Sequence, residues 1–242
     1  MTIFLAVSFV VVGFLCGATS IGGILLIPAI QYGTGMPLSL ASGTALCSFF
    51  FTAAVGTFLH ARRGNLKREI VIPQCIGALL FSCFGALTKH VVGDVALNVI
   101  LAVLIIISGI AALRQPHPVS SMETPQGRFR YLLFVGSFVG FMAGLTGMGG
   151  PVLSVPMMIV MGFSPMATVA AAQPFQMFAC FSGSVGNIIL DQINWPVALL
   201  SVVLQSLGVW AGIRAAAHVN TAFLKKSIAF LCVFTGVVML MR

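Results

Sequence analysis

Ionisable side chains are confined to short stretches of this chain, and long apolar runs separate them. All 20 of these side chains lie outside residues 3–59, 70–88, 95–113, 131–190, 196–213 and 227–241. A charged group is costly to place in hydrocarbon, and about 20 apolar residues cross a bilayer as a helix. The pattern therefore predicts an all-α polytopic membrane protein, with spans over residues 38–59, 70–88, 95–113, 166–190, 195–213 and 227–241.

Two glycine-rich breaks interrupt the apolar pattern. The first lies at residues 20–23, after a helix expected over 1–19, and leaves a short apolar piece at 24–32. The second lies at residues 147–150, after a helix expected over 131–146, and leaves a short piece at 152–161. About nine helical residues cover only about 14 Å, roughly half of a bilayer core. We interpret each break as the tip of a hairpin that enters and leaves the membrane on one side.

The two breaks belong to a sequence motif that occurs twice in the chain. Residues 13–23 read GFLCGATSIGG and residues 140–150 read GFMAGLTGMGG. The two copies align without a gap, and this alignment defines which positions of the two halves correspond. The chain thus divides into a first repeat (1–113), a Pro- and Ser-rich linker (114–130) and a second repeat (131–242). Broken helices at corresponding positions of two halves indicate a transport site.

The basic residues favour an inverted arrangement of the repeats. If the halves had the same orientation, the loops would divide the Lys and Arg residues eight against four. If each break is a hairpin, the halves are inverted and the division becomes ten against two. Because cytoplasmic loops carry an excess of Lys and Arg, we expect two inverted-topology repeats, each a broken helix hairpin followed by three spans. Residues 60–69, 114–130 and 214–226 are then cytoplasmic, and 191–195 lie outside.

Composition narrows the class further. The chain is 59% apolar and 7% charged, and its net charge of +8 comes from the loops. We therefore expect a lipid bilayer around it and no nucleic-acid partner. The six cysteines lack metal-ligand spacing and are interpreted as packing residues. The sequence contains no zinc motif, no phosphate loop and no ionisable group within the apolar runs. We therefore do not expect an enzyme, and we expect no cofactor. His60 and the other three histidines are expected in solvated connections.

Backbone groups are the main candidates for substrate binding. The pairs Gly22-Gly23 and Gly149-Gly150 are each expected to open a short helix, at Ile24 and Pro151, and a helix N-terminus attracts anions through its unpaired N–H groups. Two such ends meeting at the midplane would form an anion site. The other candidates are neighbouring groups in the breaks and on the facing spans: Thr19, Ser20, Thr146, Gly147, Ser42, Thr44 and Gln173. Close helix packing by glycine and interhelical hydrogen bonding by Gln173 and Gln176 are the alternatives.

These features together resemble the TauE/SafE sulfite and organosulfonate exporter family. The resemblance rests on the two G-F-x-x-G-x-T-x-x-G-G copies, the basic loop and the Pro/Ser linker, and it covers essentially the whole chain. It implies a bacterial inner-membrane carrier of small sulfur-containing anions such as sulfite, sulfonates or sulfoacetate. Its motifs identify the family better than a substrate.

The sequence predicts a transporter that works by alternating access. A homodimer is one assembly that is compatible with this prediction. A permease for another small solute, including one for uptake, and a non-transporting membrane scaffold are the alternatives. The runs between the loops hold no acidic residue or histidine that would relay protons. We therefore predict export driven by the membrane potential.

Overall fold

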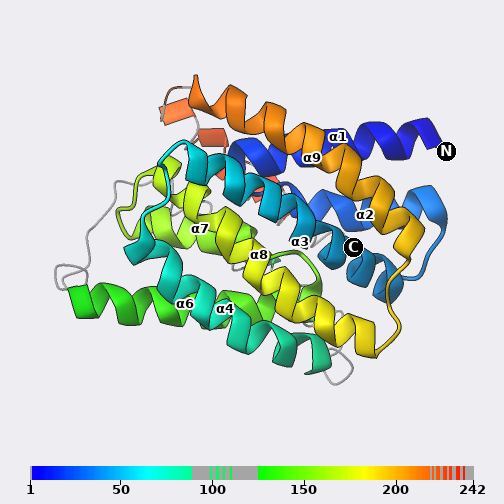
Figure 1. Cartoon of the computed structure of the whole chain (residues 1–242), viewed down its shortest axis with the longest axis horizontal. Coiled ribbons are helices and arrows are strands. Elements are labelled where there is room, and N and C mark those ends of the chain that lie inside the picture. Colours follow the sequence, from blue (N-terminus) through cyan, green and yellow to red (C-terminus); the bar gives the residue numbers. More distant parts are fainter. Residues whose placement is uncertain are drawn as a thin grey trace.

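The computed structural model describes residues 2–88 and 125–218 and scattered positions at 99–110 and 220–237. The predicted spans 95–113 and 227–241 and most of the 114–130 linker lie outside these residues. Within the described ranges all regular secondary structure is helical (Figure 1).

The helices of the first half follow the predicted pattern. They are α1 (Thr2–Thr19), the short 3₁₀ helix η1 (Gly22–Leu25), α2 (Leu26–Thr34), α3 (Leu38–Arg62) and α4 (Arg68–Thr88). The second half repeats this order with α6 (Pro125–Thr146), α7 (Pro151–Val160), α8 (Pro165–Ile189) and α9 (Trp195–Ala217). Each half therefore has a long helix, a break, a short helix and further long helices.

Several helix boundaries differ from the prediction. The short piece of the first half begins at Gly22 and not at Ile24, because residues 22–25 form a 3₁₀ turn that runs directly into α2. Helix α3 extends to Arg62, through residues assigned to the basic loop. Helix α6 begins at Pro125, because proline suits the first turn of a helix. The end of the predicted linker is therefore helical.

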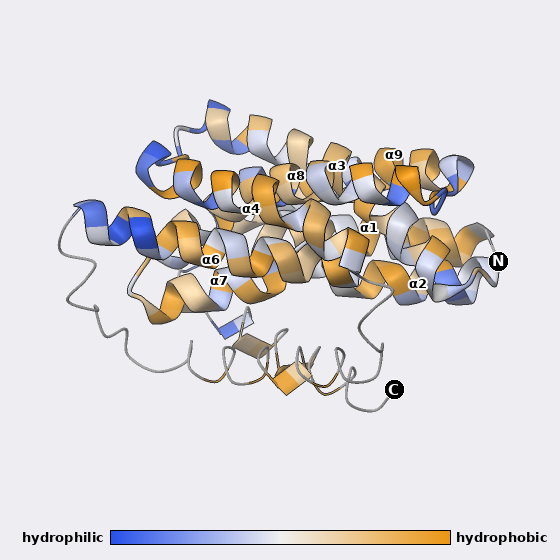
Figure 2. Ribbon diagram, turned by 90° about the horizontal axis from the view of Figure 1, so that it is seen from below, coloured by the Kyte–Doolittle hydropathy of each residue, from blue (hydrophilic) through white to orange (hydrophobic). Residues whose placement is uncertain are grey.

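The surface and the helix lengths are those of a polytopic membrane protein. Four described helices are long and apolar enough to cross a membrane, namely Ser39–Arg62, Arg68–Thr88, Pro125–Thr146 and Trp195–Ala216. Figure 2 shows apolar residues along the outer faces of these helices and polar residues concentrated at their ends. A soluble protein rarely exposes an apolar surface that is so extensive.

Equivalent helices of the two halves run in opposite directions. In Figure 1, α1 and α3 run from right to left, whereas α6 and α8 run from left to right. Contacts recur with the halves exchanged: Gly13 packs on the backbone of Gln205, and its counterpart Gly140 packs on Ala78, the counterpart of Gln205. Glycine at such crossings allows close helix approach. Antiparallel counterparts are what inverted repeats require, and the orientation of the repeats in a membrane stays a prediction.

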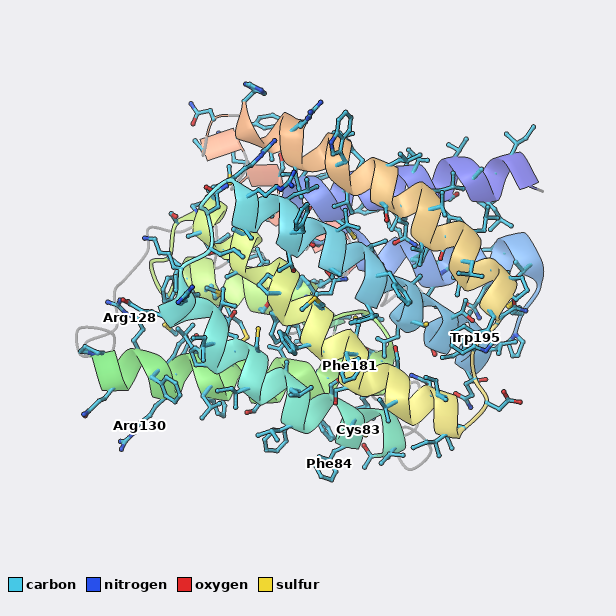
Figure 3. All side chains as sticks on the ribbon, in the orientation of Figure 1. Cys83, Phe84, Arg128, Arg130, Phe181 and Trp195 are labelled. Atoms are coloured by element: carbon cyan, nitrogen blue, oxygen red, sulfur yellow. The ribbon has the colours of Figure 1, made fainter. Side chains whose placement is uncertain are left out.

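Basic side chains gather at one end of the bundle. Arg63 Nη1 donates to the carbonyl oxygen of Ile213 (2.9 Å), which joins the end of α3 to the end of α9. Arg128 lies 3.7 Å from Glu69, which joins the beginnings of α6 and α4. Figure 3 shows Arg128 and Arg130 at this end and Trp195 at the opposite one. We call this the basic end; it is also where the sequence places the cytoplasm.

Candidate functional site

The two breaks begin with the same hydrogen-bonded turn. Thr19 Oγ1 donates to the carbonyl oxygen of Leu15 (2.9 Å), and the N–H of Ile21 contacts Thr19 Oγ1 at 3.3 Å. In the second half, Thr146 Oγ1 donates to the carbonyl oxygen of Met142 (2.8 Å), and the N–H of Met148 contacts Thr146 Oγ1 at 3.4 Å. All three pairs of positions correspond in the duplication. Both predicted threonines thus shape the ends of their helices.

The backbone conformations of the two breaks agree at the next position and differ after it. Ser20 and its equivalent Gly147 both have positive φ, at 62° and 77°. Gly149 and Gly150 also have positive φ, at 77° and 86°. Their equivalents Gly22 and Gly23 instead lie in the 3₁₀ helix η1. Side chains are strained at positive φ, so the second break needs glycine for its backbone.

Gly22 has a different requirement. A Cβ added at this position would lie 2.5 Å from the carbonyl oxygen of Val12 and 2.8 Å from the backbone nitrogen of Cys16, both on α1. The first hairpin therefore needs glycine here to close against its own helix. The predicted effect of bulk at Gly22 has this packing explanation in addition to any effect on anion access.

The two breaks meet inside the bundle, and we call their meeting point the junction. A Cβ added at Gly23 would lie 2.8 Å from the carbonyl oxygen of Met148 and 3.2 Å from the Phe49 ring. A Cβ added at Gly149 would lie 3.4 Å from the same ring and 2.8 Å from the amide nitrogen of Gln176. The junction thus brings together one glycine from each break, an aromatic ring from α3 and an amide from α8.

Gln176 is the buried amide at the junction. Its side chain is 2% exposed, and its amide nitrogen is the heavy atom nearest to a Cβ added at Gly149. A glutamine amide offers two N–H donors and an oxygen acceptor. Gln176 is therefore the side chain at the junction that suits a polar ligand.

Gln173, the glutamine predicted to bind substrate, forms hydrogen bonds within the protein. Its Nε2 donates to the carbonyl oxygen of Cys16 (2.9 Å) and to Ser20 Oγ (3.0 Å), and Ser20 Oγ donates to the carbonyl oxygen of Val169 (3.0 Å). This network fixes the end of α1 against α8. The alternative of interhelical hydrogen bonding therefore describes Gln173 in this conformation, and Ser20 is one of its partners.

Ser42 and Thr44 lie at different places on α3. A Cβ added at Gly147 would lie 2.8 Å from the Cβ of Ser42, so Ser42 borders the second break. Thr44 Oγ1 accepts a hydrogen bond from the backbone nitrogen of Asn194 (2.9 Å), at the beginning of α9. The structure therefore places Ser42, and not the hydroxyl of Thr44, beside a break.

A small cavity lies beside the second break. It has a volume of about 10 Å³ and is lined by Thr146, Gly150 and apolar neighbours, including residues of α6 and α7. This volume corresponds to about one water-sized sphere. The cavity is therefore too small for an oxyanion in this conformation.

Sequence reasoning missed Phe49 and did not select Gln176. The two positions correspond in the duplication, so they are equivalent sites in α3 and α8. The sequence signal that could have identified these positions is their difference in type, because one copy has the polar Gln176 where the other has the aromatic Phe49. Gln176 was visible as an amide in an apolar run, but only its position beside Gly149 distinguishes it from Gln173.

The prediction for His60 was wrong. Its side chain is 3% exposed inside α3, and neither ring nitrogen has a hydrogen-bond partner among the described residues. The helix continues beyond it to Arg62 and turns the ring into the bundle. His218 is exposed after α9, as predicted.

Apolar spanning helices and paired breaks at corresponding positions define a class, that of multi-pass membrane transporters. The family described as Sulfite exporter TauE/SafE matches residues 4–239. The chain belongs to this family and, like its other members, is a transporter and not an enzyme.

Relatives carry the same general description. The probable membrane transporter protein YunE of Bacillus subtilis is 25% identical over 235 residues, which cover 87% of this chain and 85% of YunE. A probable membrane transporter protein of Methanocaldococcus jannaschii is 22% identical over 255 residues, covering 96% and 94% of the two chains. ORF9 of a Sinorhizobium species, also a probable membrane transporter protein, is 27% identical over 222 residues, covering 88% and 82%. No solved structure matches the chain.

Proposed function

We propose that this chain exports small sulfur-containing anions, such as sulfite and sulfonates, across a bacterial inner membrane. The family description names sulfite export, and the junction supplies groups that suit an anion. The observation that carries the proposal is the buried amide of Gln176 beside Gly149, where the two breaks meet.

The chemistry of the junction favours an anion without any charged side chain. Helix α7 begins at Pro151 within the second break, and a helix N-terminus carries a partial positive charge. An amide N–H of Gln176 adds a donor, and glycine backbone allows close approach of an oxyanion. A site made of partial charges and hydrogen-bond donors, without a full positive charge, binds a small anion and also releases it, as transport requires.

The symmetry of the contacts supports alternating access. The junction lies between hairpins of opposite direction, and each hairpin packs against helices of the other half. Movement of one hairpin and its partner helix against the other opens the junction to one side at a time. We propose inverted repeats as the basis of this exchange.

Flux measurements in proteoliposomes test the proposal. Purified protein is reconstituted, and efflux of sulfite, a sulfonate, chloride and a neutral amino acid is compared with that from empty liposomes. We expect protein-dependent efflux of sulfite and the sulfonate alone. Equal flux of the neutral solute would favour a permease for another substrate, and no flux of any solute would contradict the proposal.

A further inference from the structure

Three buried polar groups without partners lie outside the junction, around Met158. They are the amide oxygen of Gln74 on α4, the hydroxyl of Tyr131 on α6 and the hydroxyl of Ser154 on α7. Gln74 is 0% exposed and Ser154 is 1% exposed. Native proteins keep few such groups, because each costs free energy. Three in one region indicate a site whose partners change during function.

The three groups belong to residues that lie in one region around Met158. Gln74 Nε2 lies 2.8 Å from the Met158 sulfur. Tyr131 packs against the hydrophobic group that contains Met158, Leu132 and Ala171. Ser154 lies one helical turn before Met158 on α7, so both side chains lie on one face of that helix. We call Gln74, Tyr131, Ser154 and Met158 the Met158 cluster.

The cluster lies between the basic end and the junction. Gln74 and Tyr131 follow the beginnings of α4 and α6, where Arg68 and Arg130 are exposed. On the other side, the N–H of Ser154 donates to the carbonyl oxygen of Gly150 (3.2 Å), which belongs to the second break. One helical turn, about 5.4 Å, therefore separates Ser154 from the junction.

A surface groove lies at the basic end. It has a volume of about 310 Å³ and is lined by residues of the end of α3, the α3–α4 connection and the first turns of α4, including Arg68 and Val71. Val71 also packs against the hydrophobic group around Met158. The guanidinium of Arg68 attracts anions into the groove, and Val71 belongs both to the groove lining and to the packing around Met158.

We propose that the Met158 cluster is a second substrate subsite, which holds a small sulfur oxyanion between the basic end and the junction. Tyr131 and Ser154 each supply an O–H donor, and Gln74 supplies N–H donors. The present partner of the Gln74 N–H group is a thioether sulfur, a weak acceptor that an oxyanion oxygen readily replaces. The inference rests on the proposed function, because it assigns the same substrate class.

The test removes two hydroxyls with little loss of bulk. The double variant Tyr131→Phe/Ser154→Ala is compared with wild type and with the control Tyr32→Phe/Ser206→Ala, which makes the same changes elsewhere. Sulfite transport is measured in inside-out and right-side-out membrane vesicles to give a half-saturation concentration for each side. The melting temperature of each purified protein without sulfite is measured in detergent.

The double variant should raise the half-saturation concentration at the basic end about tenfold, because two hydrogen bonds to an anion are lost. The value from the opposite side should stay within about twofold, and the control should match wild type. The melting temperature should be unchanged or higher, because two unpaired buried groups are removed.

Other results overturn the inference in distinguishable ways. Wild-type half-saturation from both sides would show that the cluster does not bind substrate. A lowered melting temperature with unchanged half-saturation would identify a hydrated structural pocket only. Absence of sulfite transport by the wild type would contradict the proposed function itself, and the subsite with it.

Discussion

Gly23 lies directly against the backbone carbonyl of Met148, so the glycine break of one half touches the break of the other. The contact joins residues that are far apart in sequence and that lie in corresponding segments of the duplication. It shows why each half needs the other: the tip of each hairpin is covered by its counterpart. It also means that the candidate site exists only where the two halves meet.

Gln173 should contribute to stability more than to substrate recognition. Gln173→Leu removes the two hydrogen bonds that the Gln173 amide donates to Cys16 and Ser20, at the end of α1. Loss of these bonds should destabilise the fold by about 1–3 kcal/mol. Thermal unfolding in detergent measures this as a lower melting temperature. An unchanged melting temperature would mean that the network does not stabilise the fold.

Equivalent glycines at the helix crossings should be equally intolerant of bulk. A Cβ at Gly17 meets the carbonyl oxygen of Val209, and a Cβ at Gly144 meets that of Ser82. Gly17→Val and Gly144→Val should therefore both reduce the yield of monodisperse protein severalfold in size-exclusion chromatography. Val11→Leu, at an exposed position of α1, is the control for added bulk. If only one glycine variant is impaired, the two crossings are not equivalent.

The ends of α9 should be labelled from opposite sides of the membrane. Trp195 and His218 are both exposed, and α9 lies between them. A membrane-impermeant thiol reagent applied to intact cells should label Trp195→Cys and leave His218→Cys unlabelled. The native cysteines in the described part of the chain are largely buried, and the wild type serves as the background control. Labelling of His218→Cys from outside would refute the inverted topology.

The buried His60 provides a direct test of the prediction that efflux is driven by the membrane potential and not by protons. Efflux of one negative charge from an inside-negative cell gains about 2.3 kcal/mol per 100 mV. We expect efflux of a permanently ionised sulfonate to follow an imposed membrane potential and to show little response to a pH gradient. His60→Gln should keep this behaviour. If instead a pH gradient drives efflux and His60→Gln abolishes the response, His60 is the proton relay and the uncoupled mechanism is wrong.

The sequence predicts most of the helices but only part of the site. Apolar runs bounded by charge locate α3, α4, α8 and α9, because hydrocarbon excludes charged groups along the chain. The pattern does not place Phe49 or Gln176 beside the second break, because both positions depend on tertiary contacts. It also misplaced His60, because a helix ends where its caps lie, and not where the first polar residue occurs.

The glycines illustrate the same limit. Their duplication predicts two equivalent tips, and the repeated Thr19 and Thr146 turns agree with that expectation. Beyond the turns, Gly149 has positive φ while Gly22 packs against α1 in a 3₁₀ helix. Identical residues in a repeated motif thus meet different physical requirements, which only the packed structure reveals.

Sulfite efflux by a Gln176 variant tests the central claim most directly. Gln176→Leu removes the amide beside Gly149 at the junction, and Gln205→Leu makes the same change at another buried glutamine. Proteoliposomes containing wild type, Gln176→Leu or Gln205→Leu are loaded with sulfite, and the initial efflux rate is measured at equal protein content. We predict that Gln176→Leu lowers the rate by about tenfold or more, because a hydrogen bond to the anion is lost, and that Gln205→Leu stays near wild type. Sulfite efflux at the wild-type rate from Gln176→Leu would contradict a substrate site at the junction.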